Sequence, residues 1–98
     1  TELDGSKFKR AKHIMEAYPN LPFILIGDSG EQDADIYLNI ARSYPERVKC
    51  IYIRTVRHKR RVAKVRALIG RTHDVEIVLV EHTKEAWEHA RLRGFVKG

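Results

Sequence analysis

Three short apolar runs that alternate with stretches of helical spacing constrain the fold of this 98-residue chain most strongly. The runs cover residues 23–26, 48–53 and 75–80. Apolar side chains recur at helical spacing over residues 7–18, 33–43 and 83–92. Strands and helices that alternate in this way form parallel sheets with right-handed crossovers. We therefore predict an α/β fold, a parallel sheet of about three strands with flanking helices.

The boundaries of these elements follow from capping and breaking residues. Ser6 is the expected N-cap of the first helix, and Thr83 that of the last. Pro19 and Pro45 each follow a tyrosine and end the helix before them. Residues 54–74 remain open, because the apolar spacing in their second half favours a helix while residues 54–61 are too charged to assign.

Composition places the chain among soluble globular proteins of one domain, residues 1–98. It is 43% hydrophobic and 33% charged, and no apolar run is long enough to cross a membrane. Cys50 is the only cysteine and lies in an apolar run, so we expect a buried thiol, a reducing compartment and a cytoplasmic location. The formal net charge of +6 indicates an anionic partner.

Residues 27–33, with the sequence GDSGEQD, follow the first predicted strand directly. Ligands of open parallel sheets bind beyond the carboxyl ends of the strands, and glycine permits a sharp exit from a strand. Asp28 and Asp33 offer the carboxylate oxygens that Mg²⁺ prefers. The alternative is purely structural: Asp33 would cap the next helix and Asp28 would form a turn.

The segments PFILIGDSGEQDADIY, YPERV and IYIR carry a resemblance. They resemble the C-terminal half of the actin-patch-protein family of Mg²⁺-dependent phosphatidate phosphatases, which is similar to the haloacid dehalogenase-like phosphohydrolases. The resemblance is specific over residues 7–53 and looser through EAWEHA and RGF. It implies a Rossmannoid fold, hydrolysis of a phosphate ester such as phosphatidate, and a role in lipid metabolism.

The resemblance also implies roles for individual residues. Asp28 and Asp33 correspond to the acids that hold Mg²⁺, and Ser29 and Gly30 would shape the loop around the substrate phosphate. Lys7 corresponds to the lysine that neutralises the nucleophile and the transferred phosphoryl group, with Lys9 as the second choice.

Two parts of the family's pattern have no match here: the nucleophile motif, and the second motif, a Ser or Thr on its own strand. The nucleophile of the superfamily is the first aspartate of an Asp-x-Asp-x-Thr-type motif on its own strand, and this sequence supplies no such motif. Phosphoryl transfer by this mechanism needs an attacking carboxylate and a proton donor as well as a metal. We therefore interpret the chain as a partial catalytic domain and expect no phosphatase turnover from it alone.

A basic run gives the alternative interpretation. Seven cations lie between residues 54 and 66, and we consider Arg54, Arg57, Arg60 and Arg61 as candidate anion-binding residues. The run could bind nucleic acid or an anionic membrane surface, or it could be a solvated helix face. No aromatic residue interleaves it, which argues against nucleic acid. A phosphate- or metal-sensing module without catalysis is a third hypothesis.

Loss of the neighbouring nucleophile strand would expose one edge of the first strand. We expect that edge to be unpaired, or covered by the first helix or by a second copy of the chain in a homo-oligomer. The five histidines are expected to be incidental surface residues, and Trp87 to be part of the core.

Overall fold

The computed structural model describes residues 2–29, 32–55, 57 and 59–96, with side chains from Phe8 onward. Within these residues lie four helices and three strands in alternation. They are α1 (Glu2–Ala17), β1 (Phe23–Asp28), α2 (Asp33–Ser43), β2 (Val48–Arg54), α3 (Lys59–Gly70), β3 (Ile77–Val80) and α4 (Thr83–Leu92).

The three strands form one parallel sheet in the order β1-β2-β3, which confirms the predicted fold class. β2 is central, and its residues 50–53 are buried. The register pairs Gly27 with Ile53 and Asp28 with Arg54. The carboxyl ends of β1 and β2 therefore lie side by side, with a polar residue at the end of each.

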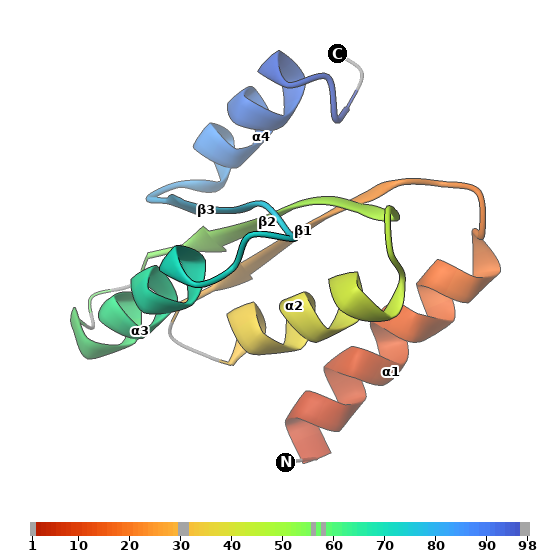
Figure 1. Ribbon diagram of the computed structural model, residues 1–98, viewed down its shortest axis with the longest axis horizontal. Coiled ribbons are helices and arrows are strands. Elements are labelled where there is room, and N and C mark those ends of the chain that lie inside the picture. Colours follow the sequence, from red (N-terminus) through yellow and green to blue (C-terminus); the bar gives the residue numbers. More distant parts are fainter. Residues whose placement is uncertain (1, 30–31, 56, 58, 97–98) are drawn as a thin grey trace.

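Helices cover both faces of this sheet (Figure 1). α2 and α3 pack on one face around Leu38, Ile51 and Leu68, while α4 packs on the other around Cys50 and Tyr52. α1 lies against α2, and Met15 is buried there beside α2 residues. The loops that leave the carboxyl ends of β1 and β2 lead directly into α2 and α3.

β1 is an edge strand in the described part of the chain. It pairs with β2 on one side, and no described strand lies on its other side. All six of its residues are half-buried, whereas β2 carries four buried residues in succession. The predicted unpaired edge is confirmed, while its coverage by a second copy of the chain stays a prediction.

Several predicted boundaries were wrong by a few residues, and β1 ends at Asp28 and not at Ile26. α1 begins at Glu2, so Ser6 lies inside the helix and not at its N-terminus. β3 begins at Ile77, because the residues before it reach β2 only through a bond from the Ile51 N–H to the Glu76 carbonyl. The N-cap of α4 is His82, whose extended backbone and reciprocal bonds with Glu85 form a capping box.

Two open or mistaken predictions concern α3 and α4. Residues 59–70 form a helix that buries Val65 and Leu68 and leaves its cations exposed. Trp87 is 50% exposed, which contradicts its predicted core position. α4 packs on the sheet through Ala86 and Ala90, so the indole lies on the neighbouring, outer part of the helix. None of the described helices is long and apolar enough to cross a membrane.

Candidate functional site

Gly27 allows the loop after β1 to fold tightly against the start of α2. A Cβ atom at this position would lie 2.6 Å from Asp33 Oδ2 and 2.7 Å from the Tyr37 ring. These separations are shorter than any ordinary contact of a Cβ atom, so a larger residue would force the strand and helix apart. The Tyr37 hydroxyl also donates a hydrogen bond to the Ile26 carbonyl at 3.3 Å.

Asp33 holds the two ends of this loop together. It is the first residue of α2, is only 4% exposed, and its Oδ2 accepts a hydrogen bond from the Asp28 N–H at 2.9 Å. Gln32 is the N-cap of α2 and makes no capping bond through its side chain. The structural alternative, in which Asp33 caps the next helix, is therefore wrong: its carboxylate binds the backbone at the end of β1.

Asp28 is bound by an arginine on the neighbouring strand, β2. Arg54 donates two hydrogen bonds to its carboxylate, from Nε to Oδ1 at 2.8 Å and from Nη2 to Oδ2 at 3.3 Å. The two side chains are 38% and 48% exposed, so the pair lies at the rim of the sheet. Arg54, one of the candidate anion-binding residues, is thus directed at the loop carboxylate and not at open solvent.

The remaining predicted residues separate into two groups. The Lys7 side chain and Gly30 lie outside the described residues. Ser29 is buried at 2% exposure, and its N–H donates to the Arg54 carbonyl at 2.9 Å, which extends the pairing of β1 with β2. Arg57 is exposed, whereas Arg60 and Arg61 lie on α3 and line a groove.

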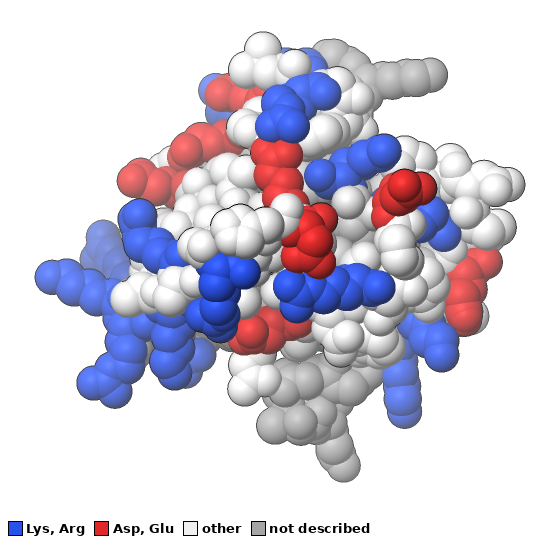
Figure 2. All heavy atoms as spheres, in the orientation of Figure 1, with Lys and Arg blue, Asp and Glu red and all other residues white. Residues whose placement is uncertain are grey.

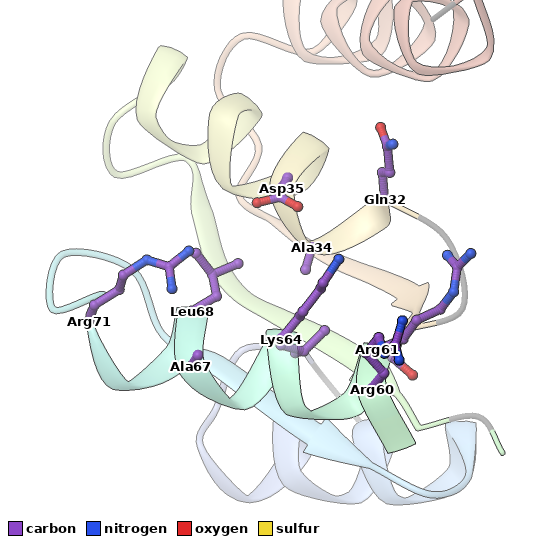
Figure 3. A pocket seen from close by; sticks show the side chains of 11 residues that line it. Gln32, Ala34, Asp35, Arg60, Arg61, Lys64, Ala67, Leu68 and Arg71 are labelled. Carbon is purple, nitrogen blue, oxygen red and sulfur yellow. The ribbon is translucent and has the colours of Figure 1, made fainter. Parts of the chain in front are cut away.

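This groove lies between α2 and α3 and has a volume of about 610 Å³. Cations from the α3 side line it: Arg60, Arg61, Lys64 and Arg71. The opposite wall comes from the loop and the start of α2, namely Ser29, Gln32 and Asp35. Figure 3 shows these side chains around the space between the two helices, and Figure 2 shows Lys and Arg gathered on the side of the molecule where α3 lies.

Sequence reasoning missed the far end of this groove. Arg71 lies beyond the basic run, and Gln32 and Asp35 were not considered. Lys64, Leu68 and Arg71 follow one another at intervals of four and three residues, the spacing of one helix face. This signal would have found the wall if residues 59–70 had been assigned to a helix.

A second group of potential metal ligands lies at the start of α4. One ligand atom from each of Glu81, His82 and Glu85 falls within 4.8 Å of the others. All three residues are exposed, and Glu85 Oε1 already accepts a hydrogen bond from the His82 N–H at 3.1 Å. The capping box therefore accounts for the approach of His82 and Glu85.

The opposite face of the sheet carries a structural network. The Tyr52 hydroxyl lies 2.8 Å from His89 Nδ1, so His89 is not the incidental surface residue that the sequence suggested. Burial raises the pKa of Tyr52, and burial also raises the pKa of the Cys50 thiol to about 11. Cys50 is fully buried, in agreement with its predicted role as a small core residue.

Comparison with known proteins identifies the family. The family described as phosphatidate phosphatase APP1, catalytic domain, matches residues 1–55. The chain belongs to this family. The matched region contains α1, β1, α2 and β2, and so includes the loop with Asp28 and Asp33. The family assignment confirms the resemblance that these residues carry.

Individual relatives cover different shares of the chain. Phosphatidate phosphatase APP1 of Saccharomyces cerevisiae is 40% identical over 54 residues, which are 55% of this chain and 9% of that protein. UvrABC system protein C of Psychrobacter sp. (strain PRwf-1) is 33% identical over 82 residues, 82% of this chain and 12% of that protein. An uncharacterized protein of Schizosaccharomyces pombe is 54% identical over 33 residues, 34% of this chain and 6% of that protein.

The chain thus spans only a small part of each of these relatives. The 82 residues shared with the UvrABC component exceed the 55 of the family match, so that similarity extends beyond β2. No solved structure matches the chain significantly.

Proposed function

We propose that this chain supplies the metal-holding loop of a haloacid dehalogenase-like phosphohydrolase that acts on a phosphate ester. Phosphatidate is the substrate that the name of the family suggests. The observation that carries the proposal is the hydrogen bond from the Asp28 N–H to Asp33 Oδ2 at 2.9 Å. It holds the Asp33 carboxylate against the Asp28 backbone at the carboxyl end of β1, where ligands of parallel sheets bind.

The donor set of this loop fits Mg²⁺. Asp28 and Asp33 present only oxygen ligands, and sites for Mg²⁺ in proteins use one or two carboxylates completed by water and substrate phosphate. Asp28 already attracts a cationic group, the Arg54 guanidinium, which shows that its carboxylate lies in reach of a positive partner. Bound there, Mg²⁺ would neutralise charge on the phosphoryl group. Arg54 would then compete with the metal or turn towards the substrate.

The chain's own residues limit the chemistry it can perform. Asp33 is buried and bound to the backbone, and Asp28 is paired with Arg54, so neither is poised to attack phosphorus. We expect no Mg²⁺-dependent release of phosphate from phosphatidate or p-nitrophenyl phosphate by these 98 residues, measured as free phosphate. Turnover that is abolished by Asp28→Asn would contradict the assignment of a supporting role.

A titration with Mg²⁺, followed through the backbone amide resonances, tests the metal loop. We expect saturable shifts centred on residues 27–33 that disappear in Asp28→Asn. Asp35→Asn is the matched control, because it removes the same charge from an exposed position two residues after Asp33. Shifts that survive in Asp28→Asn, or that Asp35→Asn abolishes equally, would reject Asp28 as a ligand.

The same titration bears on the two alternatives. A sensing module without catalysis would bind Mg²⁺ at the loop and would still lack turnover when a strand with an Asp-x-Asp motif is supplied. A basic module would show no response to Mg²⁺ and would bind anions through α3. A cytoplasmic location and contact with an anionic membrane surface stay part of the proposal.

A further inference from the structure

We propose that the groove between α2 and α3 binds a linear chain of phosphate groups. This goes beyond the metal loop, because it assigns a ligand to cations that no step at Asp28 uses. A chain of phosphates occurs in single-stranded nucleic acid and in inorganic polyphosphate, and the groove recognises the chemistry that the two share.

The cations of the groove are available for an external anion. Arg60, Lys64 and Arg71 have neither an ion-pair partner nor a side-chain hydrogen bond among the described residues. Three arginines elsewhere in the fold are paired with carboxylates and so are less available: Arg42 with Asp74, Arg54 with Asp28 and Arg93 with Glu76. Three cations without a partner among the described residues thus line one concave surface, where low-dielectric walls strengthen their attraction for an anion.

The length of the cationic wall selects a chain of phosphates over a single one. Arg60 and Arg71 lie at opposite ends of α3, with Lys64 between them (Figure 3). At the rise of an α-helix, the distance from Arg60 to Arg71 is about 16 Å. A lone phosphate contacts cations at one end of this span and leaves the other end unpaired. Several linked phosphates can neutralise the whole wall.

The remaining lining explains which part of such a ligand is bound. Buried apolar side chains of Ala34, Val65 and Leu68 line the groove, and no aromatic residue lines it in the part of the chain that the structure describes. Bases therefore have no ring to stack on, and affinity must come from the phosphates themselves. Among the described lining residues, Asp35 is the only carboxylate and stands against four cations, so this part of the groove is positive.

The groove also lies next to the proposed metal loop. Ser29 lines the groove and directly follows Asp28. A phosphate chain in the groove would place one end near the loop. The inference itself rests on the α3 cations alone, and it stands if the loop binds no metal.

Binding is tested with the 98-residue chain in EDTA, so that the metal loop makes no contribution. The probes are inorganic phosphate, tripolyphosphate, longer polyphosphate, a fluorescent oligothymidylate and vesicles containing phosphatidate. We expect affinity to rise from phosphate to tripolyphosphate to the longer chains, with the logarithm of the binding constant falling linearly with the logarithm of salt concentration. Comparing the affinity for polyphosphate with that for oligothymidylate then shows whether the groove prefers inorganic polyphosphate or single-stranded nucleic acid.

Two variants and two matched controls locate the site. Lys64→Gln and Arg71→Gln each remove one groove cation. Each should weaken binding of the phosphate chain, and each should lower by about one the slope of the logarithm of the binding constant against the logarithm of salt concentration. Lys12→Gln and Arg10→Gln remove the same charges from exposed positions on α1 and should change neither quantity. Asp28→Asn should not weaken binding of the phosphate chain, which separates this test from that of the metal loop.

Three results would overturn the inference. The first is equal affinity for inorganic phosphate and for tripolyphosphate, which would indicate a site for one phosphate. The second is an equal loss in the α1 and α3 variants, which would indicate attraction by net charge. The third is binding to phosphatidate vesicles without binding to any phosphate chain, which would indicate a membrane surface.

Discussion

At the scale of single residues, the loop after β1 depends on the absence of a side chain at Gly27. The backbone there passes so close to Asp33 and Tyr37 that a methyl group has no space. The close approach is what allows the Asp28 N–H to reach Asp33 Oδ2. The same glycine therefore determines both the stability of the loop and the placement of the proposed metal ligands.

Gly27→Ala should destabilise the protein. The added methyl would lie 2.6 Å from Asp33 Oδ2 and 2.7 Å from the Asp33 Cβ, and overpacking of this kind costs about 1–3 kcal/mol. Gly70→Ala is the control, because nothing lies within 4 Å of the added methyl at the end of α3. We expect Gly70→Ala to be neutral or up to about 1 kcal/mol more stable, as alanine is favoured in helices. Urea unfolding measures both, and equal stability of the two variants would contradict the observed packing.

Cys50 should be unreactive in the folded protein. Its side chain is fully buried, and burial raises the pKa of the thiol to about 11, so little thiolate forms at pH 8. Ellman's reagent should modify it only as fast as the protein opens, and at once in concentrated guanidinium. Rapid modification of the native protein would show that the α4 face is open.

The same thiol predicts a pH dependence of stability. The pKa in the folded state is raised above the unfolded value of about 8.5, so the protonated thiol contributes stability that is complete below about pH 8.5. This contribution is lost as the pH rises towards 11. The unfolding free energy should therefore fall more steeply over this interval in the wild type than in Cys50→Ala.

At the scale of elements, one arginine joins the end of α1 to the start of β2. Arg47 Nε donates to the Leu21 carbonyl at 2.9 Å, and its Nη2 donates to the carbonyls of Met15 and Tyr18 at 3.1 and 2.6 Å. These carbonyls belong to the last turn of α1 and the connection to β1. Carbonyls at a helix end have no partner within the helix, so the guanidinium donates hydrogen bonds that the helix backbone cannot.

Arg47→Met should loosen α1 without disrupting the sheet. Loss of the three bonds should lower the unfolding free energy by about 2 kcal/mol and speed hydrogen exchange in the last turn of α1. Arg42→Met is the control, because it removes an exposed ion pair with Asp74 and should have a much smaller effect. Unchanged exchange in α1 would refute the role of Arg47.

At the scale of the whole molecule, the sequence predicts helices and strands from local apolar spacing, but it misses contacts between residues of different elements. The spacing of apolar runs was sufficient for the parallel sheet. The segment GDSGEQD was predicted to follow the first strand, but its first two residues belong to β1 and its last begins α2. The pairing of Arg54 with Asp28 was missed because it depends on the register of β1 against β2. The groove was missed for a similar reason: its walls come from α2 and α3, which β2 separates in the sequence.

The central claim, that Asp28 and Asp33 hold a divalent cation, is tested most directly with Mn²⁺. Mn²⁺ takes the oxygen ligands that suit Mg²⁺, and its unpaired electrons broaden nearby amide resonances. We predict broadening that is strongest at residues 27–33, reversed by excess Mg²⁺, lost in Asp28→Asn and retained in Asp35→Asn. Broadening centred instead on Glu81, His82 and Glu85, with the amides of residues 27–33 unaffected, would contradict the account.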